Sequence, residues 1–136
     1  MDIGLLRLLI DFGLVVLIWI VQLIIYPSFT YYQNTSLLKW HRIYTGRVTI
    51  IVLPLMVSQL IISVIQVLNG LNLYTIASLF IIIILWLLTF LLFVPLHQKI
   101  DQNKFESSTT VRLVNLNWFR TALWSLLFFL SLLNYI

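Results

Sequence analysis

Long apolar runs separated by short polar segments dominate the pattern of this chain. Four runs, at about residues 5–26, 48–68, 74–96 and 117–135, are long enough to cross a bilayer, because about 20 helical residues span its hydrocarbon core. Lipid offers the backbone no hydrogen-bond partner, so each run must be helical, and the runs are too continuous for the alternating strands of a barrel. The pattern therefore predicts a single all-α domain over residues 1–136, a four-transmembrane-helix bundle.

The first two connections differ in length. Residues 69–72, Asn-Gly-Leu-Asn, predict a tight turn between the second and third spans. The connection at about residues 27–46 is longer, and Thr35 or Ser36 could cap a short helix within it. We expect that helix to lie at the membrane interface.

The third connection, residues 98–116, is the most polar stretch of the chain. Its spacing predicts a second short amphipathic helix, with Phe105, Val111 and Leu113 facing the membrane. Each of these two connections would therefore carry a short interfacial helix.

Composition and charge agree with a membrane location. Hydrophobic residues make up 62% of the chain and charged residues only 9%, against roughly 25% in soluble domains. The absence of cysteine excludes disulfides, thiolate metal sites and a cysteine nucleophile. The positive-inside rule places the first and third connections in the cytoplasm and both termini on the other side. The net charge of +4 then reflects topology and contact with lipid headgroups, not binding to nucleic acid. The cationic residues of the two connections are Lys39, Arg42, Arg47, Lys99, Lys104 and Arg112.

Most reactive side chains gather at the predicted cytoplasmic ends of the spans. His41 and His97, the only histidines, could be haem or metal ligands, a proton donor and acceptor, or interfacial residues bonded to water and headgroups. Arg120 lies about one turn inside the fourth span, where an unpaired charge is costly, so we expect it to point into the bundle. These three are the candidate catalytic residues. Candidate residues for binding a cofactor or substrate are Tyr26, Trp40, Tyr44, Arg47, Asn117, Trp118 and Trp124.

Polar residues also occur deeper in the spans. Asp11 follows Arg7 by four residues, which predicts a helical ion pair that anchors the first span. Gln59 and Ser63 should face the bundle interior, because lipid would not solvate them. No paired carboxylates, Gly-rich phosphate loop or His-x-x-x-His metal motif is present.

The two halves of the chain share short features. The steps Tyr26-Pro27 and Val94-Pro95 end the first and third predicted spans, and each is followed by a Trp-x-Arg triplet. Either parallel hairpin repeats or chance would explain this similarity between the two halves.

Four segments carry a resemblance to known proteins, at residues 26–29, 40–47, 94–100 and 117–124. Together they resemble a family of small uncharacterised four-span bacterial membrane proteins, and the match covers most of the chain. The resemblance implies a four-span protein of the bacterial inner membrane. A more distant resemblance is to anthrone-oxygenase-like membrane proteins, which implies oxidative chemistry. His97 stands where that group usually has Asn.

Two classes of function fit these features. The first is a small membrane oxidoreductase or cofactor-binding protein that acts on a lipophilic substrate at the cytoplasmic ends of the helices, with haem as a candidate cofactor. The second is a non-catalytic subunit or assembly factor of a larger membrane complex, which the small size and incomplete catalytic set favour. A transporter is less favoured, because four spans leave little room for a pore. The expected partners are membrane lipids and either a lipophilic small molecule or a larger membrane complex.

Overall fold

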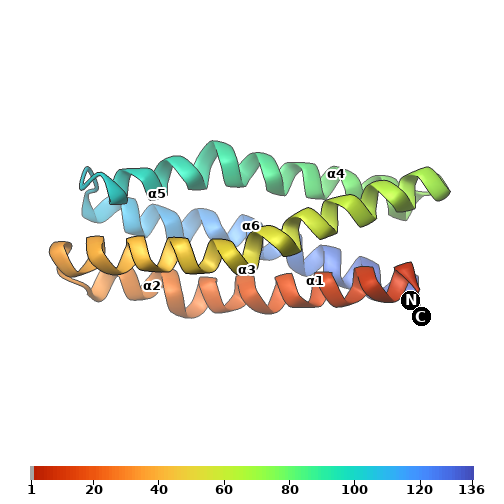
Figure 1. Cartoon of the computed structure of the whole chain (residues 1–136), viewed down its shortest axis with the longest axis horizontal. Coiled ribbons are helices and arrows are strands. Elements are labelled where there is room, and N and C mark those ends of the chain that lie inside the picture. Colours follow the sequence, from red (N-terminus) through yellow and green to blue (C-terminus); the bar gives the residue numbers. More distant parts are fainter. Residues whose placement is uncertain (1) are drawn as a thin grey trace.

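Four long helical segments run side by side in the computed structural model, which describes residues 2–136 (Figure 1). Each segment is long and apolar enough to cross a membrane, and none of the described residues forms a strand. The predicted all-α bundle of an integral membrane protein is therefore confirmed. The segments span Ile3–Tyr31, Asn34–Asn69, Leu73–Asp101 and Ser107–Tyr135.

Both termini lie at one end of the bundle, as Figure 1 shows. The opposite end holds the connections at residues 32–33 and 102–106, and we call it the two-loop end. The two halves of the chain are thus hairpins that present their polar connections together. The elements in order are α1 Ile3–Ile20, η1 Val21–Ile25, α2 Tyr26–Ser28, η2 Phe29–Tyr31, α3 Asn34–Asn69, α4 Leu73–Leu88, η3 Thr89–Phe93, α5 Val94–Asp101 and α6 Ser107–Tyr135.

The first and third segments each contain a five-residue π-helical stretch just before a proline. The π-helix η1 precedes Pro27 and the π-helix η3 precedes Pro95. Proline lacks an N–H, and in an α-helix its ring collides with the carbonyl four residues earlier, so a wider turn relieves the clash. Both segments remain helical beyond the proline, so the helices do not end at these steps.

The two separate interfacial helices do not form. The predicted short helices are instead the first turns of α3 and α6, which continue unbroken into the membrane spans. Gln33 occupies the N-cap position of α3, where Thr35 or Ser36 was expected. Leu113 is fully buried within the bundle and does not face the membrane, whereas Val111 is exposed. A continuous helix is favoured because each break would leave unpaired backbone groups.

The turn between α3 and α4 matches the sequence prediction. Asn72 caps α4 by accepting a hydrogen bond from the Thr75 N–H at 2.9 Å, and the Thr75 hydroxyl accepts one from the Asn72 N–H at 3.1 Å. This reciprocal arrangement satisfies two donors at the helix start and stabilises the turn that joins the two hairpins.

Buried polar side chains of α1, α3 and α6 meet between the termini and the middle of the bundle. Arg7 Nε donates to Asp11 Oδ2 at 2.7 Å, and both side chains are fully buried. Asp11 also accepts hydrogen bonds from Gln59 Nε2, at 2.6 Å, and from the Ser131 hydroxyl. Arg7 Nη1 donates to Gln66 Oε1 at 3.2 Å. The predicted Arg7–Asp11 pair is confirmed, and it joins three helices instead of only anchoring the first.

Candidate functional site

Four hydrogen-bonded side chains form a continuous chain near the two-loop end. Asp101 Oδ1 lies 2.7 Å from His41 Nδ1, and His41 Nε2 lies 2.7 Å from His97 Nδ1. His97 Nε2 lies 3.0 Å from the Tyr26 hydroxyl. The Asp101 side chain is 37% exposed, whereas His41 is fully buried and Tyr26 is 3% exposed. The four residues therefore connect a partly exposed carboxylate to a buried phenol through one buried and one partly exposed imidazole, and we call them the Asp–His–His–Tyr chain.

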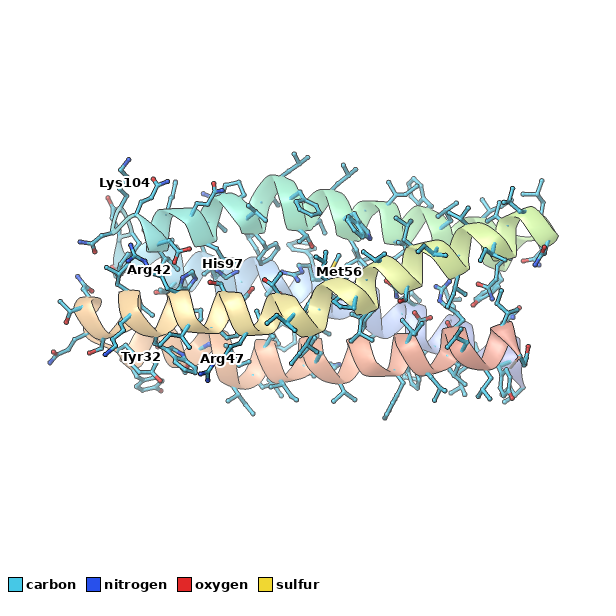
Figure 2. The ribbon with its side chains drawn as sticks, viewed as in Figure 1. Tyr32, Arg42, Arg47, Met56, His97 and Lys104 are labelled. Carbon is cyan, nitrogen blue, oxygen red and sulfur yellow. The ribbon has the colours of Figure 1, made fainter. Side chains whose placement is uncertain are left out.

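Three helical elements supply these side chains. His97 and Asp101 lie one helical turn apart on α5, so they share a face of that helix. His41 reaches them from α3, and Figure 2 shows His97 between these two helices. The edge contact of His41 with the Phe29 ring, at a centroid distance of 5.6 Å, packs the imidazole on its other side. The expectation that the two histidines approach each other is confirmed.

The hydrogen bonds have one direction when Asp101 is ionised and both imidazoles are neutral. A carboxylate only accepts, so His41 Nδ1 carries the proton and its Nε2 accepts from His97 Nδ1. His97 Nε2 then accepts from the Tyr26 hydroxyl. If every proton moves one step, Asp101 gains a proton and the Tyr26 end loses one. The chain can therefore pass a proton without carrying a free ion through apolar surroundings.

We expect both imidazoles to be Nδ1–H tautomers when the pH of the solution is above the ordinary titration range of histidine. Nitrogen-15 NMR of histidine-labelled protein in lipid nanodiscs would show this directly. Asp101→Asn should mix the tautomers of His41, because an amide can donate as well as accept. The control is Glu106→Gln, which changes an exposed carboxylate that is not part of the Asp–His–His–Tyr chain. An Nε2–H tautomer at either wild-type histidine would contradict the assigned direction.

A cavity of about 440 Å³ lies beside the Asp–His–His–Tyr chain, and Tyr26, His97 and Asp101 all belong to its lining. Its polar groups include Tyr26, His97 and Arg120, and Met56 lies on the far wall between α3 and α4 (Figure 2). The volume lies within the usual range for small-molecule sites, which are mostly apolar with a few polar groups. The apolar lining comes from Leu14, Leu17, Ile18, Val21, Val48, Val52, Leu53, Met56, Phe90, Phe93 and Val94.

Arg120 points into the bundle, as the sequence predicted. It is only 7% exposed, and its guanidinium carbon lies 4.2 Å from the centre of the Phe93 ring and 5.2 Å from that of Trp124. Both rings attract the cation. Its Nε is buried without a hydrogen-bond partner, and within residues 2–136 no carboxylate forms an ion pair with it.

The other candidate residues fall into three groups. Tyr44 and Trp124 are buried and line the cavity. Asn117 is buried but outside the lining, where its Nδ2 donates to Gln22 Oε1 at 3.0 Å. The remaining candidates are exposed and lie outside the cavity lining, namely Trp40, Arg47 and Trp118.

Sequence reasoning missed two members of the site. Asp101 lies in the predicted third connection and was not singled out, although its spacing of four residues from His97 is a signal that both share a helix face. Phe93 gave no signal, because a phenylalanine inside an apolar run has the same appearance whether it faces lipid or a cavity.

The arrangement of the histidines does not fit paired haem ligands. All four ring nitrogens already have side-chain partners, and one nitrogen of each ring is bonded to the other ring. In the described part of the chain, no group of three or more His, Asp or Glu side chains could hold a metal ion. The geometry instead favours the proton donor and acceptor interpretation of the pair.

The comparisons with known proteins add no assignment to this geometry. No protein-family model, no curated protein and no solved structure matches the chain. The interpretation of the site therefore depends on the residues described above.

Proposed function

We propose that the protein is a membrane enzyme that moves a proton to or from a lipophilic substrate held in the cavity. The observation that carries this proposal is the Asp–His–His–Tyr chain, whose members Tyr26, His97 and Asp101 line the cavity. A general acid or base positioned in this way typically contributes 10²–10⁴-fold to a rate. The apolar lining favours a lipophilic substrate.

The simplest such reaction is proton removal next to a carbonyl group. The C–H bond of the substrate breaks as the Tyr26 oxygen takes its proton, while the Tyr26 hydroxyl proton passes to His97 Nε2. The electron pair of the broken bond moves to the carbonyl oxygen, which becomes an enolate beside Arg120. The proton leaves through His41 to Asp101. Tyr26 stays neutral at the start and end, and return of a proton to carbon reverses the steps.

An oxidoreductase acting on a lipophilic substrate, which the sequence also favours, would use the same groups. Reduction of a quinone-type substrate consumes protons as well as electrons, and the Asp–His–His–Tyr chain would deliver those protons. Acid–base chemistry is the part of either reaction that the described side chains supply by themselves. We therefore propose proton transfer as the core of the function.

Deuterium exchange at carbon tests this proposal. The protein in lipid nanodiscs would be incubated in D₂O with dialkyl, aryl and polycyclic ketones, and deuterium incorporation next to the carbonyl would be measured by mass spectrometry. We expect faster exchange of at least one ketone than in empty nanodiscs. Tyr26→Phe should remove the acceleration, because the ring remains but the hydroxyl is lost.

Tyr44→Phe is the matched control, because Tyr44 lines the same cavity but is not part of the Asp–His–His–Tyr chain. It should keep most of the activity. The proposal fails if no ketone exchanges faster than in empty nanodiscs. It also fails if the two tyrosine variants lose activity equally.

We further propose that the protein lies in a bacterial inner membrane with its two-loop end in the cytoplasm. Arg42 and Lys104 both lie at that end (Figure 2), as expected when short cationic connections are retained inside. Asp101 would then exchange protons with cytoplasmic water.

Alkaline phosphatase fusions test this orientation, because the enzyme is active only outside the cytoplasm. A fusion after Ile136 should be active in a bacterial host, and one at Asn103 should be inactive. The reverse pattern of activities would invert the orientation.

A further inference from the structure

We infer that the cavity binds a lipophilic monoanion, with its negatively charged oxygen on Arg120 and its apolar body towards the middle of the bundle. The inference rests on the proposed function for the choice of site. It adds the charge class of the ligand and the residue that recognises it.

The two buried arginines differ in their partners. Arg7 is fully buried and has Asp11 at 2.7 Å. Arg120 is more than nine-tenths buried, lines the cavity and has no ion-pair partner in residues 2–136. A buried cation without an anion is strongly unfavourable, so the bundle should obtain the missing negative charge from a ligand.

The protein has no spare carboxylate to pair with Arg120. It contains four acidic residues in total, and each is either paired with another side chain or exposed at the start of a helix. Asp11 pairs with Arg7, and Asp101 is bonded to His41. Asp2 and Glu106 are exposed and cap α1 and α6. Asp101 lines the same cavity but is engaged by His41, so we expect the negative charge beside Arg120 to come from a molecule outside the protein.

The surroundings of Arg120 indicate an apolar body for the rest of the ligand. Phe93 and Trp124 cover the guanidinium with aromatic faces, and the wall beyond is formed by residues such as Leu14, Val52 and Met56. A small inorganic anion would leave this apolar volume unfilled. An anion with an apolar body fills it and meets Arg120 with its charged end.

The cavity also has a side that faces lipid. Leu53 of α3 and Phe90 of η3 line it, although 44% and 51% of their respective surfaces are exposed. Such residues form a wall between the cavity and the bilayer. A lipophilic anion can therefore enter sideways from the membrane, between α3 and η3.

Native mass spectrometry of the detergent-solubilised protein would measure binding of three probes. Palmitate carries a carboxylate, a long-chain acylated cyclic diketone carries an enolate near neutral pH, and hexadecanol is a neutral molecule with a similar chain. We expect at least one anion to bind at least tenfold more tightly than hexadecanol. Preference for palmitate alone would identify a carboxylate ligand, and preference for the diketone alone would identify an enolate.

Arg120→Gln should reduce anion binding at least tenfold, whereas Arg112→Gln should not change it. Arg112 is the matched control, because it is an exposed arginine on the same helix, outside the cavity. Thermal unfolding would confirm that each variant is folded. If Arg120→Gln is unfolded, Arg120→Lys serves instead, and it should keep the preference for anions because the charge remains. Equal binding of the anions and hexadecanol, or unchanged anion binding in Arg120→Gln, would overturn the inference.

The same probes separate this inference from the proposed function. The Tyr26→Phe variant should still bind the anion, because the anion pairs with Arg120 and not with Tyr26. Anion binding without any ketone exchange would overturn the proposed function alone. Ketone exchange without a preference for anions would overturn the present inference alone.

Discussion

Replacing Asp11 by leucine should destabilise the bundle by about 3–5 kcal/mol, the loss typical when one partner of a buried ion pair is removed. Asp11→Leu leaves the Arg7 guanidinium fully buried without an anion. It also removes the acceptor of the Gln59 amide and the Ser131 hydroxyl, so three helices lose a shared contact.

Reversible unfolding in mixed detergent and SDS micelles would measure this loss. Asp2→Asn is the control, because it alters an exposed carboxylate of the same helix and keeps a side-chain oxygen as the cap, so its effect should stay within about 0.5 kcal/mol. The double variant Arg7→Met/Asp11→Leu should recover much of the stability, because apolar residues often replace a buried ion pair without loss. A loss for Asp11→Leu as small as that for Asp2→Asn would show that the ion pair contributes little.

Replacing His97 by phenylalanine should lower the ketone exchange rate by about 100-fold or more, the low end of what a positioned acid or base contributes. His97 is the central link, with one nitrogen bonded to His41 and the other to Tyr26. Phenylalanine keeps an aromatic ring in that space but interrupts both bonds. Tyr26 would then have no base to receive its proton.

Initial rates of deuterium incorporation in nanodiscs would measure this effect. Gln98→Leu is a suitable control, because Gln98 also lines the cavity but is not part of the Asp–His–His–Tyr chain. Asp101→Asn should have a smaller effect than His97→Phe, because the Tyr26–His97 bond remains. An exchange rate in His97→Phe equal to that of Gln98→Leu would show that no proton passes through the imidazole.

The sequence was sufficient to predict the bundle and the meeting of His41 with His97. His41 comes after the first predicted span and His97 after the third. Because these two spans run in the same direction, the topology alone brings both histidines to one end of the bundle. The inward direction of Arg120 was predictable for a related reason, since lipid penalises a charge at that depth. These features depend on membrane crossing and helix order, which apolar run lengths determine.

The other features of the site depend on how each helix is rotated about its axis and on where it continues without a break. The residue types alone do not predict either property. Trp40 and Trp118 are exposed, whereas Trp124 lines the cavity, although all three occur near the same predicted end. An aromatic residue near an interface is typical of either position. Asp101 was missed because the third span was predicted to end at residue 96, whereas α5 continues to Asp101.

The two π-helical stretches have a consequence for insertions and deletions. Each residue of an α-helix turns the chain by about 100°, so a single extra residue accommodated in a wider turn rotates everything after it by that angle. Tyr26 follows η1 directly, and His97 lies four residues beyond η3. Deleting Leu23 or Leu91 would convert the wide turn to an ordinary one and swing the downstream phenol or imidazole towards the lipid. The hydrogen bond between Tyr26 and His97 therefore depends on chain length upstream of each residue as much as on the two side chains themselves.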